Sequence, residues 1–165
     1  MRQIPALNMQ NIFRSKKIWR RILAGAVLVF LGMQFFNPSL KNPPVVPGHD
    51  LVATNPPPPE VAALLHEACY DCHSNETRWP WYAHVAPVSW WIVSHMKEGR
   101  DNLNFSEWPH NDANAAGDEL GSIGHQVQTH KMPLPSYTWL GLHPEARLTE
   151  EQRGRILKWT ESAGQ

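Results

Sequence analysis

The chain has 165 residues and a formal net charge of zero, with fifteen basic and fifteen acidic residues. This balance gives no indication of nucleic-acid binding, which depends on a basic surface. Only two cysteines are present, so no other cysteine competes with them for pairing. The charge is nevertheless uneven. The first 21 residues carry six basic and no acidic side chains, whereas residues 22–165 carry nine basic and fifteen acidic ones.

An apolar stretch at residues 18–36 follows this basic segment. Its 19 residues approach the roughly 20 that a helix needs to cross a bilayer, and Arg20 and Arg21 can extend toward the lipid headgroups. We therefore predict a single transmembrane anchor at 18–36. Residues 1–17 would form a basic cytoplasmic tail, and the rest of the chain would lie outside the bacterial inner membrane, in the periplasm. No cleavage site of small residues follows Phe36, which favours an anchor over a removed signal peptide.

Eight prolines lie in residues 37–59, which predicts an extended, semi-rigid linker that holds the following domain away from the membrane. Residues 60–165 are then enough for one small domain. Pro59 suits the first position of a helix. Val61, Leu64, Leu65 and Ala68 follow at helical spacing and predict one buried face leading into Cys69.

Cys69-Tyr70-Asp71-Cys72-His73 has the C-x-x-C-H spacing of a c-type haem attachment site. Two intervening residues place both sulfurs on one helical turn, and the following histidine can bind the iron. A structural zinc site would need further paired ligands, and a thioredoxin-like pair would need a βαβ context. A plain dithiol or disulfide is the remaining alternative. The motif thus predicts one covalent haem c held by Cys69, Cys72 and His73.

Three further helices are expected downstream. Residues 88–98 form the first, with Gly99 just beyond its end. Asp112 caps the second, which runs to about Gln128. The capping box at 149–152 begins the third, whose apolar face holds Ile156, Leu157 and Trp159. With no strand alternation, the chain is predicted to be all-α: a small cytochrome c-like haem domain with long loops, preceded by one transmembrane helix.

Met132, between Lys131 and Pro133, is the predicted second axial ligand of the iron. Pro133 and Pro135 would stiffen the loop that carries this weak thioether ligand. His95 is the rival ligand, and an open sixth position is a third possibility. Arg78 and Arg100 are candidates to pair with the haem propionates. Four tryptophans are candidates to wall the haem or simply to pack the core: Trp79, Trp81, Trp90 and Trp91.

The chain resembles the bacterial haem-binding domain family of small membrane-anchored c-type cytochromes. The resemblance rests on residues 69–77, 79–83, 85–91, 99–100, 103–108 and 132–137, which keep the family's motif order. It implies that Cys69, Cys72 and His73 attach and ligate the haem, and that the Met-Pro pair supplies the distal ligand. The sequence departs from the family in residues 112–130, which are rich in Gly, Asn and Ala.

These features predict a periplasmic monohaem cytochrome that carries single electrons between redox partner proteins of the respiratory or periplasmic system. No catalytic residues are expected, because no nucleophile–base or acid–base pair stands out. A peroxidase-like or ligand-binding haem protein with a labile sixth ligand is the alternative. A haem sensor is less favoured, because a cytoplasmic tail of about 17 residues is too short for an output domain.

Overall fold

The computed structural model describes residues 9–109 and 111–164, and within these ranges it contains helices and no strand. The prediction of an all-α chain is therefore confirmed. Residues 1–8, including Arg2 of the expected basic tail, lie outside the described residues. The elements in chain order are α1 Met9–Met33, η1 Gln34–Phe36, α2 Leu51–Thr54, α3 Pro59–Ala68, α4 Tyr70–His73, η2 Trp81–His84, α5 Val88–Asn102, η3 Phe105–Glu107, α6 Ala113–Gln128, α7 Pro135–Thr138, η4 Trp139–Gly141, η5 Pro144–Ala146 and α8 Glu150–Ala163.

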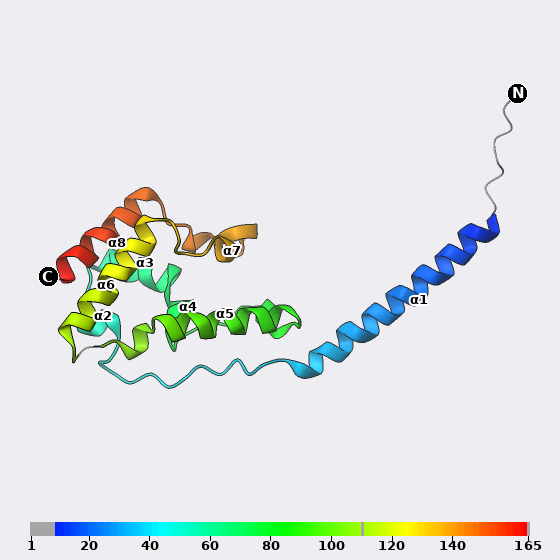
Figure 1. Ribbon diagram of the computed structural model, residues 1–165, viewed down its shortest axis with the longest axis horizontal. Coiled ribbons are helices and arrows are strands. Elements are labelled where there is room, and N and C mark those ends of the chain that lie inside the picture. The colour runs from blue at the N-terminus through cyan, green and yellow to red at the C-terminus, as the bar shows by residue number, and fades with distance from the viewer. Residues whose placement is uncertain (1–8, 110, 165) are drawn as a thin grey trace, which may run out of the picture.

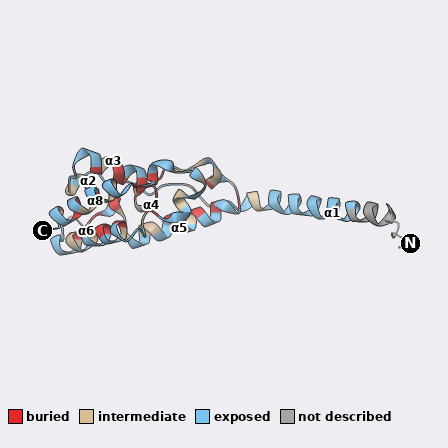
Figure 2. Cartoon of the chain, turned by 90° about the horizontal axis from the view of Figure 1, so that it is seen from above, coloured by how far each residue is buried: buried red, intermediate tan, exposed pale blue. Residues whose placement is uncertain are grey.

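Helix α1 projects away from the other helices (Figure 1), and residues 16–32 along it are exposed (Figure 2). The segment Lys16–Phe36 is long and apolar enough to cross a membrane, and none of it is buried within the protein. Its length and composition fit either a membrane span or a signal sequence. Apolar side chains exposed along a whole helix indicate that something other than the protein covers them.

The segment between α1 and α3, predicted to be an extended, semi-rigid linker, makes contacts with the domain. The side chain of Asn42 donates to Thr77 O at 2.9 Å, and that of Asn75 donates to Pro44 O at 3.0 Å. Further along, Leu51 of α2 is fully buried in the main core. These contacts lay the proline-rich segment against the domain, so it joins the two parts of the chain without holding them apart. The expected domain boundaries remain a prediction.

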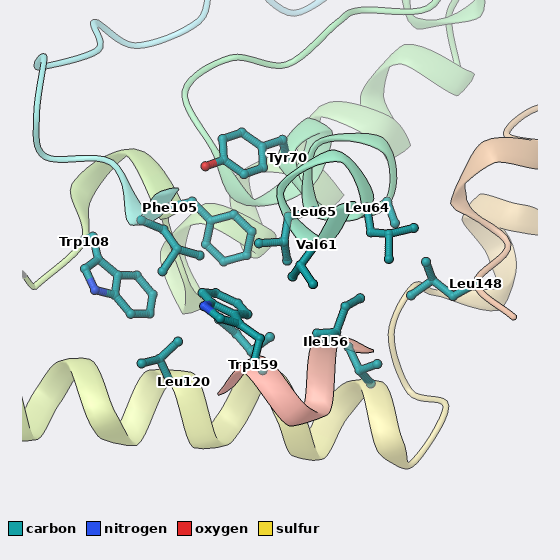
Figure 3. Close-up of a cluster of buried hydrophobic side chains, with 14 of the residues drawn as sticks. Val61, Leu64, Leu65, Tyr70, Phe105, Trp108, Leu120, Leu148, Ile156 and Trp159 are labelled. Carbon is teal, nitrogen blue, oxygen red and sulfur yellow. The ribbon is translucent and has the colours of Figure 1, made fainter. Parts of the chain in front are cut away.

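The main core is formed by residues of α3, α6 and α8, with both α3 and α6 packed against α8 (Figure 3). Val61, Leu64, Leu65 and Ala68 of α3 are all buried, as the helical spacing predicted. They meet Leu120 of α6 and, from α8, the buried side chains of Ile156 and Trp159.

The two predicted signals for the start of a helix, the cap at Asp112 and the capping box at 149–152, are confirmed as well. Asp112 accepts hydrogen bonds from Asn114 N and Ala115 N at the start of α6, and Thr149 with Gln152 forms the capping box of α8. The glycines of α6 do not interrupt that helix. At Gly124 the absence of a side chain makes room for Thr160 of α8, because an added Cβ would lie 2.6 Å from Thr160 Oγ1.

Helix α5 runs four residues past residue 98, where the sequence indicated its end, so Gly99 lies inside the helix and does not end it. The reason is packing, since a Cβ added at Gly99 would lie 2.7 Å from Cys72 O. Only a residue without a side chain lets α5 approach the backbone of α4 so closely. The glycine that was expected to end the helix instead fixes the distance between α5 and the Cys-x-x-Cys-His turn.

We therefore expect Gly99→Ala to destabilise the protein by about 1–3 kcal/mol, because a methyl group would be forced against backbone that cannot move aside cheaply. The matched control is Gly154→Ala in α8, where nothing lies within 4 Å of the added Cβ. There the helix should gain about 0.5–1 kcal/mol. Thermal unfolding of both full-length variants in the same detergent checks the pair. A stability for Gly99→Ala equal to or above that of Gly154→Ala would contradict the close approach.

Candidate functional site

The Cys-x-x-Cys-His segment forms the turn that its spacing predicted. Cys69 precedes α4, and its carbonyl accepts from Cys72 N at 3.1 Å and from His73 N at 2.9 Å. This single turn presents both thiols and the imidazole to the same cavity. Both cysteines are free thiols. Burial raises the pKa of Cys69 to about 12 and that of Cys72 to about 11. A C-x-x-C pair that exchanges disulfides has a lowered thiol pKa, so these values do not favour a dithiol redox site.

The ring of His73 is oriented by the backbone of the chain that follows α5. Its Nδ1 lies 3.0 Å from Leu103 O, and because a carbonyl oxygen can only accept, Nδ1 carries the proton. The lone pair is then on Nε2. Burial lowers the pKa of His73, although hydrogen bonding to the carbonyls of Leu103 and Gly99 opposes this effect. A neutral imidazole fixed through Nδ1, with Nε2 free, is the usual form of a histidine that binds a metal.

A cavity of about 540 Å³ opens in front of this turn. Its lining is mainly apolar and comes from α3, α4, α5, α6 and the loop after α6. Cys69, Cys72, His73 and Met132 all line it, so the four predicted site residues are brought together from positions 63 residues apart. The rival ligand His95 lines the same cavity. The roles of these residues as ligands remain predictions.

The loop that carries Met132 is held on two sides. On one side, Lys131 N and Met132 N both donate to Gln126 O of α6, at 3.0 and 3.1 Å. On the other side, Arg153 of α8 donates from Nη1 to Val127 O and to Met132 O, each at 2.9 Å. A cation at the C-terminal end of α6 is also favourable for the helix dipole. The position of Met132 is therefore determined by backbone hydrogen bonds, in addition to the neighbouring prolines.

Asp71, between the two cysteines, links the motif to the other side of the cavity. Its buried carboxylate accepts from Arg78 N at 2.9 Å, from Arg78 Nη2 at 2.9 Å and from the Tyr137 hydroxyl at 3.1 Å. Tyr137 follows Met132 by five residues and lines the cavity as well. Hydrogen bonds thus join the cysteine turn to the methionine loop through protein groups alone.

Arg78 and Arg100 are not placed as propionate partners. The guanidinium of Arg78 is bound to Asp71, and Arg100 donates to Ser74 O at 2.7 Å and to Thr77 Oγ1 at 2.6 Å. Neither arginine lines the cavity. Both instead fix the loop that follows His73.

The expected tryptophan wall is also absent from the cavity. None of Trp79, Trp81, Trp90 and Trp91 lines it, and the last three are exposed. Phe105, Ile123 and Val127 supply apolar lining in their place. The sequence could not show this, because side-chain direction depends on how α5 is placed against α4.

These residues suit a flat, mainly apolar iron cofactor. Two thiols lie at one wall, an imidazole offers a free nitrogen, and a thioether and a second imidazole are available from other elements. Cysteine, histidine and methionine are the side chains with which proteins hold haem. The cavity volume also lies in the range of cofactor sites, about 300–1,000 Å³.

The fold and the site define a helical haem-binding protein with an apolar N-terminal helix. The profile of the haem-binding domain family matches residues 28–162, and the chain belongs to that family. Searches of the curated proteins and of the solved structures found no significant match. The match begins within α1 and includes the proline-rich segment, in agreement with the contacts between that segment and the domain.

Three structural supports of the site were missed by sequence reasoning. These are the Leu103 carbonyl that orients His73, the Asp71 carboxylate that reaches Tyr137, and the Arg153 side chain that holds the Met132 loop. Each acts across 21 residues or more of sequence. Backbone carbonyls carry no sequence signal, and a single charged residue does not reveal a distant partner.

For Arg153→Gln we expect a loss of about 1–3 kcal/mol in stability, because two backbone carbonyls lose a charged donor. Amide hydrogen exchange in residues 129–134 should become faster. Arg155→Gln on the same helix is the control. Arg155 pairs with Glu151 at the surface, and this substitution should cost less than about 0.5 kcal/mol. Hydrogen exchange measured by mass spectrometry compares the two variants. Equal exchange in residues 129–134 would contradict the proposed support.

Proposed function

We propose that this chain is a membrane-anchored monohaem c-type cytochrome that carries single electrons. The observation that carries the proposal is the convergence of Cys69, Cys72, His73 and Met132 on one cavity in a chain of the haem-binding family. Cys69 and Cys72 would form thioether bonds to haem c, and His73 and Met132 would be the axial ligands of its iron. Bound haem would supply a one-electron ferric–ferrous couple.

The protein's contribution is to fix the ligands before any electron moves. Leu103 O fixes the His73 ring, and Arg153 with Gln126 fixes the backbone of Met132. His73 and Met132, held in place in this way, would be positioned to bind the iron in both oxidation states, so little rearrangement of the protein would accompany electron transfer. The apolar lining excludes water, and a thioether ligand raises the reduction potential.

Helix α1 supports a location at the bacterial inner membrane. The segment Lys16–Phe36 has the length and composition of a span, and basic residues precede it in the sequence. Basic flanks stay on the cytoplasmic side, which would place the haem domain in the periplasm. The electron donors and acceptors would then be redox proteins of the respiratory or periplasmic system.

Covalent attachment is tested by replacing the two cysteines. In the full chain expressed with a bacterial haem-attachment system, haem should migrate with the protein on a denaturing gel. Cys69→Ala or Cys72→Ala should weaken that band, and the double variant should abolish it, because each thiol makes one bond to the haem. Met132→Ala is the control and should keep the band. A wild-type protein that loses all its haem on denaturation would contradict c-type attachment while leaving haem binding intact.

The sixth ligand is tested by spectra of Met132→Ala beside His95→Ala. We expect Met132→Ala to abolish the sulfur-to-iron charge-transfer band of the ferric protein and to lower the reduction potential, because a thioether stabilises ferrous iron. His95→Ala should leave both unchanged. The reverse pattern would identify His95 as the ligand. Carbon monoxide binding to the ferrous wild type would indicate a labile sixth position and a peroxidase-like or ligand-binding protein.

A further inference from the structure

Large apolar side chains are exposed on the part of the domain that adjoins α1. Trp81 of η2 is 76% exposed, and Trp91 of α5 is 51% exposed. The exposed large apolar residues of η1, of η2 and of the first turn of α5, here called the anchor-end patch, are Phe35, Phe36, Trp81, Val88, Trp90 and Trp91. The two phenylalanines end the candidate span, and the other four residues lie on η2 and α5, which pack against each other. Single exposed apolar residues are ordinary, but several that lie close to an apolar helix point to a surface with a partner.

Hydrogen bonds fix this patch to the end of α1. The Gln34 side chain donates to Ala86 O at 3.1 Å and accepts from Ala86 N at 3.0 Å. Asn37 donates to His84 O at 3.2 Å and accepts from the Ser89 hydroxyl at 2.6 Å. Together these bonds hold the start of α5 beside the end of the apolar helix, as Figure 1 shows. The domain is therefore joined to α1 by a specific contact in addition to the chain itself.

Trp90 completes the connection, because its indole Nε1 donates to Phe36 O at 2.9 Å while its ring stays 40% exposed. Phe36 is the last residue of the candidate span Lys16–Phe36. If that segment crosses a bilayer, its end lies at the boundary between lipid tails and headgroups. The indole ring of Trp90, which is hydrogen-bonded to Phe36, must then lie at a similar depth, and tryptophan is enriched at this depth in membrane proteins.

We propose that the anchor-end patch seats the domain on the outer surface of the bilayer, with the patch side chains in the headgroup region. This rests on the proposed function only in requiring that α1 remain as a membrane span. The lipid is the occupant that fits, because the patch is continuous with the span and its aromatic rings are amphipathic. The domain would then lie on the membrane, whereas the sequence predicted a linker that holds it away from the membrane.

Helix α5 then sets the height of the cavity above the lipid. Trp91 lies in the patch, whereas His95 and Gly99 of the same helix line the cavity. At about 1.5 Å per residue these two positions lie about 6 and 12 Å further along the helix axis. The seated domain would hold its redox centre at a fixed short distance from the membrane surface, where a membrane-embedded partner could reach it.

The test uses the full chain in lipid nanodiscs that hold one copy each. Hydroxyl-radical oxidation of individual tryptophans is measured by mass spectrometry and normalised to the rate in the unfolded chain. Glu161→Trp provides an exposed reporter on α8, at the end of the domain away from α1 (Figure 1). We expect Trp81 and Trp91 to be oxidised several-fold more slowly than this reporter, although the protein itself leaves both rings exposed.

Oxidation of Trp81 and Trp91 at the reporter's rate would overturn the proposal. So would protection that is present only in discs with several copies, since a second copy of the chain would then cover the patch. Carbonate extraction and the intact mass are determined first. A chain that carbonate removes from the membrane, or whose N-terminal helix has been cleaved, overturns the anchor and the seating together. If Trp81 and Trp91 are oxidised slowly in a protein that holds no haem, the result supports the seating on the membrane. The missing haem then counts only against the proposed haem function.

Discussion

The close approach of α5 to the Cys-x-x-Cys-His turn at Gly99 determines the geometry of most of the site. Because no side chain separates the two backbones there, α5 forms one wall of the cavity directly beside Cys72. The chain leaves α5 at Leu103, whose carbonyl then orients the His73 ring. A larger residue at position 99 would displace the wall and the orienting carbonyl together.

Sequence reasoning succeeded where the determining interactions are local. Three predicted features each depend on residues within one or two helical turns: the buried face of α3, the cap at Asp112 and the capping box at Thr149. It failed where distant segments meet. The role of Gly99 depends on Cys72, and Arg78 is engaged by a carboxylate inside the haem motif, so neither could be inferred from neighbouring residues. The contacts of the proline-rich segment with the domain could not be predicted either, because composition indicates stiffness but not what a stiff segment packs against.

The opposite walls of the cavity are joined by contacts between protein groups. Asp71 connects the cysteine turn to Tyr137, and Arg153 connects the methionine loop to α8 and to the end of α6. A loop fixed in this way loses little conformational entropy when its side chain binds a metal, which is important for a weak ligand such as a thioether.

Helix α5 also connects two regions that are far apart in the sequence, the end of α1 and the cavity. Its first turns are bound to the end of α1 through Ser89 and Trp90, while its later turns line the cavity. Gln34 lies near the end of the candidate span Lys16–Phe36 and Asn37 directly follows it, and hydrogen bonds satisfy the polar side chains of both residues. The same hydrogen bonds fix the start of α5 beside the end of α1, and α5 extends from there to the cavity.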